Sequence, residues 1–373
     1  MSESAKKFIF ALATFSGTII GVGFFSLPYI TLKTGIFLIL GYFLILGILV
    51  SLVHLFFGEL ALKTPDFKRF PAFAKIYLGE KGEKIALIST ILGLFGANLA
   101  YLIVGGEFLE NLFSPILGRD NLFWTLVYFS LGTILIFLGI KIISKIELLA
   151  LLSFFLILIL MFVKGFPYFK ISNLFLSSPN FSNFFLPYGP ILFSLWGAAL
   201  IPEVEEMLGE DKKLIKKLIS LGIFIPILVY LFFILLVLGI TGVQTTESAL
   251  PGLRSFFAPN IFSLALLLGV FTTFTSFIAL GLTLKKVFWY DLKMEENLAW
   301  LITCFVPLTL FLAGARNFIP IISFLGAFML GIDGILILLM YQKIKSRKFW
   351  FLTFPLILIF VFGIIYEIIY FLR

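Results

Sequence analysis

A succession of long apolar runs with short polar connections limits this chain to very few folds. A helix rises about 1.5 Å per residue, so roughly 20 apolar residues in a row can cross the hydrocarbon core of a bilayer. Of the 373 residues, 61% are hydrophobic and 13% are charged, with a mean hydropathy of +1.14. Eleven such runs lie at 8–30, 36–62, 85–112, 122–140, 146–165, 187–208, 218–242, 259–284, 298–314, 318–341 and 349–371. The sequence therefore predicts an all-α, polytopic membrane protein with eleven transmembrane helices.

The basic residues predict how these helices are oriented. If the N-terminus is cytoplasmic, 21 of the 28 Lys and Arg residues fall in cytoplasmic segments, and the excess alternates from loop to loop. This is the positive-inside pattern, which places the C-terminus outside. The short loops suit a prokaryotic inner (plasma) membrane. The pattern also accounts for the net charge of +8, so the lipid bilayer is an expected partner and nucleic acid is not. Oligomeric state cannot be read from the sequence.

The first apolar run is interrupted at its centre. Residues 15–28 read F-S-G-T-I-I-G-V-G-F-F-S-L-P, with Gly17, Gly21 and Gly23 followed by Pro28. Glycine destabilises a helix by roughly 1 kcal/mol relative to alanine, and proline by about 3 kcal/mol. Small residues can serve close helix packing, which is the simpler interpretation. Transporters, however, use an unwound segment in mid-membrane to present backbone N–H and C=O groups to a substrate or an ion.

The sixth run is interrupted as well, by Gly197 and Pro202 near its middle, with Ser194 beside them. Because the first and sixth runs are five apart, they enter the membrane from opposite sides. Two broken helices in corresponding positions of two inverted halves indicate an inverted-repeat transporter; the alternative is two unrelated packing kinks. We expect a single transmembrane transporter domain over 1–373, with repeat one at about 8–165, repeat two at about 187–341 and an extra helix at about 349–371.

The broken helices also suggest the chemistry of the substrate. Half-helix N-termini carry a partial positive charge and favour an anionic group such as a carboxylate. Unwound carbonyl groups favour a cation or an ammonium group. A zwitterionic amino acid matches this pair better than a sugar or a lipid does.

Several motifs resemble a known group of transporters. G-T-I-I-G-V-G-F-F-S-L-P at 17–28 is similar to the first-span signature of the amino acid/auxin permease and hydroxy/aromatic amino acid permease families, and W-G-A-A-L-I-P-E-V-E-E at 196–206 to their sixth span. T-S-F-I-A-L-G-L-T-L-K-K-V-F-W-Y-D at 275–291 resembles the eighth span of tryptophan/tyrosine-type permeases, and 138–147 the turn into the fifth span of the wider superfamily. These families belong to the amino acid–polyamine–organocation superfamily. The resemblance implies a LeuT-type 5+5 inverted repeat with helices one and six broken, plus one extra helix.

The resemblance also implies site residues. The substrate-binding set comprises the amides of the first break, the second break and a tyrosine of the third span: Thr18, Gly21, Val22, Gly23, Tyr101, Ser194, Trp196 and Gly197. Tyr101 lies three residues from Asn98 and hence on the same helical face, where it could instead be an ordinary packing aromatic.

For the coupling ion the resemblance leaves two possibilities. Sodium-coupled members hold a cation between the first and eighth spans, and the matching positions are Gly17, Ile20, Thr272, Thr275 and Ser276. Their oxygen ligands suit a hard cation. Some proton-coupled relatives place a lysine in span five, which 150–155 lacks, so sodium stays open. The aromatic permeases, however, are regarded as proton symporters. The coupling ion is thus sodium or a proton, and no cofactor is expected.

Two ionisable residues within spans are candidates for carrying a proton. Intramembrane ionisable groups are costly enough to count as functional candidates. Glu203 follows the second break, where it could otherwise pair near the cytoplasmic half. His54, the only histidine, titrates near pH 6.5 when unperturbed, but a lone histidine is more often structural.

We therefore predict a secondary active symporter of amino acids, aromatic or other bulky neutral ones, that works by alternating access. An enzyme is not expected, because one histidine and one cysteine allow neither a metal cluster nor an H-E-x-x-H motif. The alternative is a transporter-like amino-acid sensor or an exchanger without ion-driven uptake.

Overall fold

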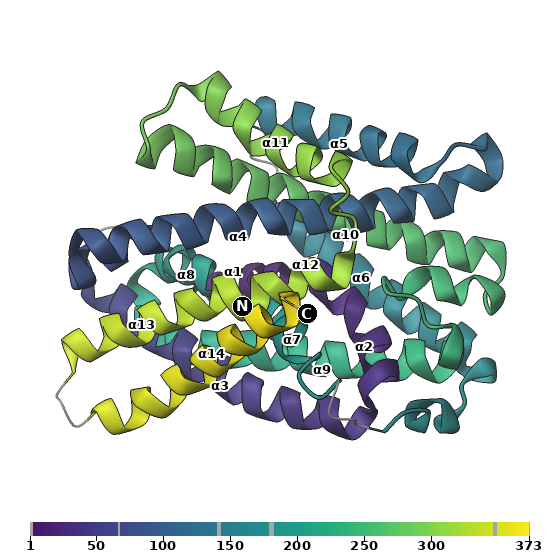
Figure 1. The fold of residues 1–373 in the computed structure, drawn as a ribbon, viewed down its shortest axis with the longest axis horizontal. Helices are drawn as coiled ribbons and strands as arrows, with labels where there is room; N and C mark the ends of the chain where they lie inside the picture. The colour runs from purple at the N-terminus through teal and green to yellow at the C-terminus, as the bar shows by residue number, and fades with distance from the viewer. Residues whose placement is uncertain (1–2, 66–67, 140–142, 179–182, 346–348, 373) are drawn as a thin grey trace.

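The computed structural model describes residues 3–65, 68–139, 143–178, 183–345 and 349–372, and most of these residues lie in helices (Figure 1). The α-helices are α1 (Glu3–Ile19), α2 (Leu27–Thr34), α3 (Ile36–Lys63), α4 (Phe70–Leu117), α5 (Asn121–Phe137), α6 (Ile143–Gly165), α7 (Tyr188–Leu195), α8 (Ile201–Leu208), α9 (Ile215–Thr241), α10 (Pro259–Lys286), α11 (Glu296–Leu312), α12 (Phe318–Phe324), α13 (Leu330–Ile344) and α14 (Trp350–Phe371). Extended pairing in the described ranges is limited to an isolated antiparallel bridge, Thr246–Ala249.

Shorter helical segments join or interrupt the α-helices. The 3₁₀ segments are η1 (Val22–Ser26), η2 (Phe166–Tyr168), η3 (Ile171–Phe175), η4 (Ala198–Leu200), η5 (Gly209–Leu214), η6 (Gly242–Gln244) and η7 (Leu250–Ser255). Two segments have π-helical geometry, η8 (Val287–Asp291) and η9 (Leu325–Met329).

Six helical stretches of the described chain are long and apolar enough to cross a membrane, and the bent pair of Glu3–Ile19 with Val22–Thr34 makes a seventh. Three further apolar helices are shorter, at Asn121–Phe137, Ser153–Tyr168 and Glu296–Leu312. Each of the eleven predicted runs contains helix, and most ends agree within about three residues. The chain is thus an all-helical, multi-pass membrane protein.

The largest difference from the predicted runs is in α4, whose run was expected only at 85–112. The structure has one helical stretch from Phe70 to Leu117, in which Gly79 (φ 76°) marks a change of direction. Helix resumes directly after Gly79 because Glu80, Lys81 and Glu83 are good helix formers. The apolar period alone could not place that start.

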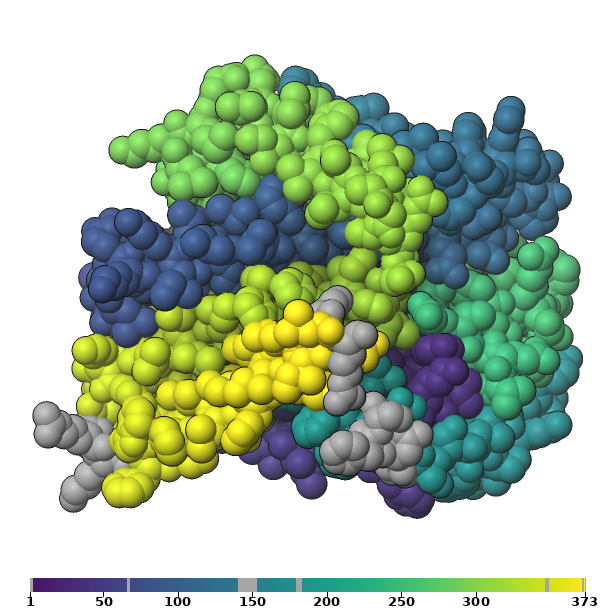
Figure 2. Space-filling model, viewed as in Figure 1, coloured from purple at the N-terminus to yellow at the C-terminus, as the bar shows by residue number. Residues whose placement is uncertain are grey.

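The helices form two groups (Figure 1). The first group contains α4, α5, α10 and α11, which pack against one another. The second contains α1, α2, α3, α7, α8 and α9. Helix α6 contacts both α10 and α1, and α13 contacts both α4 and α3, so these two join the groups. Figure 2 shows α13 and α14 side by side on one face of the molecule.

Small residues allow the close contacts inside the first group. If Gly106 of α4 carried a Cβ, that atom would lie 2.9 Å from the Cβ of Thr125 in α5. A Cβ on Gly269 of α10 would lie 2.6 Å from the ring of Phe108 in α4. Large apolar side chains on the outer faces are exposed instead, among them Phe37, Leu44 and Phe351. This combination is typical of a helix bundle in lipid.

Candidate functional site: the two helix breaks

The first break lies between α1 and η1. Regular helix ends at Ile19, Gly21 is extended (φ −100°, ψ −155°), and the helical pair on either side is bent by 46°. Gly17 and Thr18 lie before the break in regular α1, where the Thr18 hydroxyl donates to the Thr14 carbonyl at 2.9 Å. The non-helical segment is therefore shorter than the glycine pattern suggests, because Ser16 to Thr18 stay helical and chain direction changes only at Ile20–Gly21.

The second break lies between α7 and η4, at Trp196 (φ −81°, ψ 123°) and Gly197 (φ −135°, ψ 13°). Pro202 was expected to contribute to this interruption, but it lies in the first turn of α8. There it lacks only an N–H that would have no partner in the helix anyway. Pro202 thus starts the second half-helix, and the break itself precedes it.

The two breaks lie against each other. A Cβ on Gly23 would come within 2.5 Å of the Ser194 hydroxyl oxygen, and a Cβ on Gly197 within 2.8 Å of Ile19. Gly23, Ser194 and Gly197 were predicted as site residues, whereas Ile19 was not, and the two residues of each pair lie about 170 positions apart in the chain. The fold brings them to one place, as an inverted-repeat arrangement requires.

Tyr230 of α9 links the breaks directly. Its buried hydroxyl lies 2.7 Å from the Ile19 carbonyl oxygen and 2.8 Å from the Ser194 carbonyl oxygen. A phenolic O–H has one proton to donate, so these two carbonyls share it. Tyr230 was not among the residues predicted from the sequence. The available signal was a single tyrosine within the otherwise apolar run of α9.

His54 of α3 lies at the second break. Its Nε2 accepts a hydrogen bond from the Gly197 N–H at 2.9 Å, and its Nδ1 lies 2.8 Å from the Val50 carbonyl oxygen. A carbonyl can only accept, so Nδ1 carries the proton and the ring is the neutral Nδ1–H tautomer. The ring also stands edge-on to Trp196, with centroids 5.0 Å apart. A second proton on Nε2 would displace the Gly197 N–H, so His54 could carry a proton only if this contact opened.

Tyr101 of α4 lies at the first break. Its hydroxyl accepts from the Val22 N–H at 3.2 Å and lies within electrostatic range of the Ser276 hydroxyl of α10. A Cβ on Gly21 would overlap this hydroxyl. The structure therefore joins three residues that the sequence predicted separately, namely Tyr101, Val22 and Ser276.

The other cation candidates are less closely connected. The Thr275 hydroxyl is directed to its own helix, 3.1 Å from the Phe271 carbonyl oxygen and 3.2 Å from that of Thr272. Gly17 and Ile20 lie on the other side of the first break, in or directly after α1. Of the five candidates, Ser276 is the one that the structure connects to the first break through the Tyr101 side chain.

Glu203 lies exposed in the first turn of α8, within electrostatic range of Lys286 and Arg69. Arg69 in turn forms an ion pair with Asp291: its Nη1 lies 3.0 and 3.2 Å from the two carboxylate oxygens. The pair joins the segment before α4 to the end of η8. It lines an open cavity of about 410 Å³, on the side that the basic residues predict to be cytoplasmic. This Arg69–Asp291 pair was also missed by the sequence analysis, since residues so far apart give no local signal.

Over the described ranges, no group of three or more His, Cys, Asp and Glu side chains could hold a metal ion. The arrangement instead offers backbone donors and acceptors beside aromatic hydroxyls. Such groups can bind a small zwitterion or a hard cation without an acid–base pair or a nucleophile.

Comparison with known proteins agrees with this chemistry. The model of the tryptophan/tyrosine permease family matches residues 4–370. A curated relative, glutamine transporter 2 of Aliivibrio fischeri (strain ATCC 700601 / ES114), is 22% identical over 345 residues, which are 89% of this chain and 88% of the relative.

Two solved transporters share the fold. One is Mhp1, a nucleobase-cation-symport-1 family transporter in a closed conformation with bromovinylhydantoin bound; the TM-score is 0.68 at 14% identity, over 96% of this chain and 90% of that one. The other is MhsT in complex with L-phenylalanine, with a TM-score of 0.63 at 16% identity, over 96% of this chain and 97% of that one. The likeness confirms the LeuT-type fold expected from the sequence.

Proposed function

The chain belongs to the tryptophan/tyrosine permease family, and from that premise we propose that it is a secondary active symporter of amino acids, driven by a sodium or a proton gradient. All eleven helical runs cross the membrane in this proposal, with the N-terminus cytoplasmic and the C-terminus outside. Helices α1 to α6 form repeat one, α7 to α13 form repeat two, and α14 is the extra helix.

The observation that carries the proposal is the contact between the two breaks. Gly23 packs on Ser194, and the Tyr230 hydroxyl bridges the Ile19 and Ser194 carbonyls. Where two interrupted helices meet in mid-membrane, their unpaired backbone groups face protein or a cavity and not lipid. The free-energy cost of exposing these groups to lipid is thus avoided, and they can bind a substrate. A substrate carboxylate would take the place of the Tyr101 hydroxyl as acceptor for the Val22 N–H. The substrate ammonium group would face carbonyls at the ends of α1 and α7.

The proposed substrates are aromatic or other bulky neutral amino acids. The family is named for tryptophan and tyrosine, the solved transporter MhsT is in complex with L-phenylalanine, and the relative from Aliivibrio fischeri is named for glutamine. All four are neutral zwitterions, which fits the expected pairing of a backbone donor for the carboxylate with backbone acceptors for the ammonium group. Glutamine is therefore included among the test substrates.

Alternating access follows from the two helix groups. The breaks belong to the second group, whereas Tyr101 and Ser276 belong to the first. A substrate bound at the first break therefore lies between the groups, and rocking one group against the other would expose it to each side in turn. The Arg69–Asp291 pair closes the cytoplasmic side in this conformation.

The test is uptake into proteoliposomes of labelled tryptophan, tyrosine, leucine and glutamine, first under a sodium gradient and then under a proton gradient. Accumulation above the external concentration under either gradient supports symport and identifies the ion. Binding of an amino acid without accumulation under either gradient would contradict symport and favour a sensor or an exchanger. Failure of all four to bind would contradict the substrate class.

A further inference from the structure

A buried carboxylate in α14 has no role in the site described above. Glu367 is only 1% exposed. Its helix, α14, is nevertheless the least buried of the six long spans, because only 22% of its most apolar 18-residue stretch is buried inside the protein. The Ser323 hydroxyl of α12 donates to its Oε2 at 3.1 Å, and Oε1 has no hydrogen-bond partner. In the part of the chain that the structure describes, no ion pair to Glu367 is found.

An ionised carboxylate in such surroundings is strongly disfavoured. Burial without a paired cation costs several kcal/mol by general estimates, and the group binds a proton instead. The titratable groups around Glu367 are phenols: Tyr188 of α7, and Tyr366 and Tyr370 of α14 itself. Helix α13, which packs on α14, carries a second buried acid, Asp333, within electrostatic range of Ser89 of α4. Among the residues that the structure describes, no positive charge is found next to Glu367, which leaves a proton as the simplest ligand.

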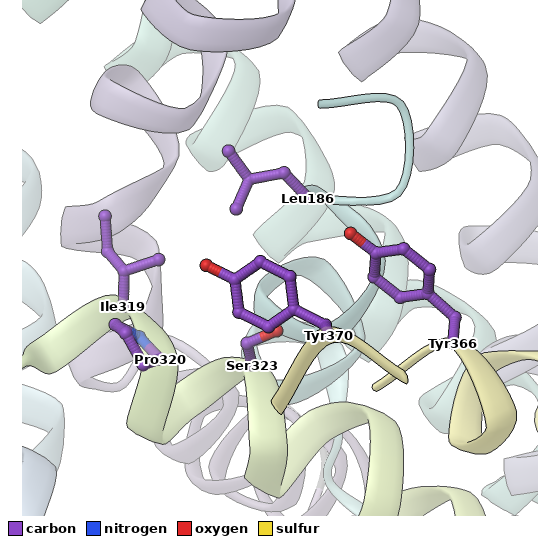
Figure 3. A pocket seen from close by; sticks show the side chains of 6 residues that line it. All are labelled: Leu186, Ile319, Pro320, Ser323, Tyr366 and Tyr370. Carbon is purple, nitrogen blue, oxygen red and sulfur yellow. The ribbon is translucent and has the colours of Figure 1, made fainter. Parts of the chain in front are cut away.

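A small hollow provides a route for that proton. It is lined by Leu186, Ile319, Pro320, Ser323, Tyr366 and Tyr370 (Figure 3). Its volume of about 10 Å³ is close to the least that holds one water molecule. Ser323 both lines the hollow and donates to Glu367, so its hydroxyl connects the hollow with the carboxylate. Leu186 and Ile319 adjoin loops predicted to be external.

The same contacts hold the first half of the broken sixth span. Ser323 packs so closely on Gly189 of α7 that a Cβ there would lie 2.7 Å from the Ser323 Cα. The neighbouring Tyr188 hydroxyl donates to the Ile359 carbonyl of α14 at 3.3 Å. Further along α14, the Phe360 ring meets Trp196 of the second break edge-on, with centroids 6.3 Å apart. Glu367 is therefore one hydrogen bond from a residue that fixes α7.

We propose that Glu367 is a proton-binding site that couples protonation from the outer side to the position of α7. Water in the hollow gives a proton to the Ser323 hydroxyl, which passes its own proton to Oε2. The neutral carboxyl keeps Ser323, Gly189 and α7 packed against α14. Loss of the proton leaves a charge that requires water, so α12 and α14 separate and α7 is released. The coupling to transport rests on the proposed function, whereas proton binding does not.

The first test needs no substrate. Infrared titration of the purified full-length protein follows the C=O stretch of protonated carboxyl groups as pH is raised. We expect Glu367→Gln to remove a titrating component that the matched control Asp333→Asn leaves in place. An identical titration in the wild type and in Glu367→Gln would overturn the proposal.

A second variant covers the case in which Glu367→Gln does not fold. Ser323→Ala keeps the carboxyl group but removes the donor that favours its charged form, so the midpoint of the same infrared component should move to higher pH. An unchanged midpoint would overturn the proposal as well.

The transport consequence is tested in proteoliposomes. Glu367→Gln should lose at least about tenfold of the accumulation driven by a proton gradient, which corresponds to roughly 1.4 kcal/mol, while exchange of labelled for unlabelled amino acid continues. The same loss in Glu203→Gln, with Glu367→Gln unaffected, would move the site to Glu203. If the wild type transports nothing but the infrared component is present, the symporter proposal fails and the proton site stands.

Discussion

The two helix breaks are held in different ways. At the first break, the Val22 N–H donates to Tyr101 of α4, a helix of the other group. At the second, the Gly197 N–H donates to His54 of α3, a helix of the same group. Each break has one backbone donor satisfied by one side chain from a distant helix, but only the first contact crosses between the groups.

This difference indicates that the two breaks have different roles. A contact within one group persists when the groups move, so His54 serves as a fixed support for the second break. A contact between the groups must change when they move, so Tyr101 reports the conformational state. We therefore expect changes at the first break to affect transport most, and changes at the second break to affect stability.

The largest effect is expected for Gly21→Val. The new side chain overlaps the Tyr101 hydroxyl and prevents close approach to the backbone at the break, so uptake should fall at least about 100-fold, or roughly 2.7 kcal/mol. Proteoliposome uptake measures this, with the amount of inserted protein determined in parallel. Gly41→Val is the matched control, because a Cβ at Gly41 meets no heavy atom within 4 Å. Near-normal uptake by Gly21→Val would remove the first break from the site.

Tyr101→Phe sharpens the comparison further. The ring stays and the hydroxyl is lost, which leaves the Val22 N–H without its acceptor at a cost of about 1–3 kcal/mol. This cost falls on the substrate-free protein and is removed when the proposed substrate carboxylate pairs with the N–H, so substrate affinity should rise about tenfold. Equilibrium binding of labelled substrate gives the affinity. Unchanged affinity would make Tyr101 a packing residue.

For His54→Ala we expect a loss of stability and no change in ion coupling. Gly197 loses its acceptor, and the packing between Phe15 and Trp196 loses a ring. The protein should lose about 1–3 kcal/mol of stability, seen as a lower melting temperature in detergent. The proton dependence of any remaining uptake should be unchanged. A selective loss of proton coupling without a loss of stability would show that His54 carries the proton.

Much of this arrangement was predictable from local sequence. The glycines and the apolar runs predicted that the first and sixth helices break, because helix propensity acts over a few residues. The all-helical, multi-pass fold and the resemblance to tryptophan/tyrosine permeases are confirmed, while the count of eleven spans and the 5+5 repeat stay predictions. The side chains that contact the breaks could be predicted only in part. Tyr101 was expected from a resemblance and His54 as a candidate for carrying a proton, while Tyr230 was not predicted.

What could not be predicted depends on register between distant helices. Whether a hydroxyl on α9 reaches two carbonyls, or Glu367 turns inward on a peripheral helix, is decided by helix rotation, which a run that is apolar on every side does not specify. The predictions for Gly17 and Thr18 as parts of an unwound segment were wrong for a related reason. Glycine permits an irregular backbone but does not require it, and α1 continues through both residues.

The smallest effect is expected at the Arg69–Asp291 pair, another contact between distant segments. Its side chains are 30% and 34% exposed, so solvent screens the attraction and the pair contributes about 0–1 kcal/mol. Arg69→Ala should therefore leave the melting temperature unchanged and shift the balance toward an inward-open conformation by a few-fold. A cysteine placed beside the cavity, at Ala72, should react faster with a water-soluble maleimide in Arg69→Ala than in the parent background, because opening increases its access. Equal labelling rates would mean that this pair does not close the pathway, and that closure depends on the contacts around the two breaks.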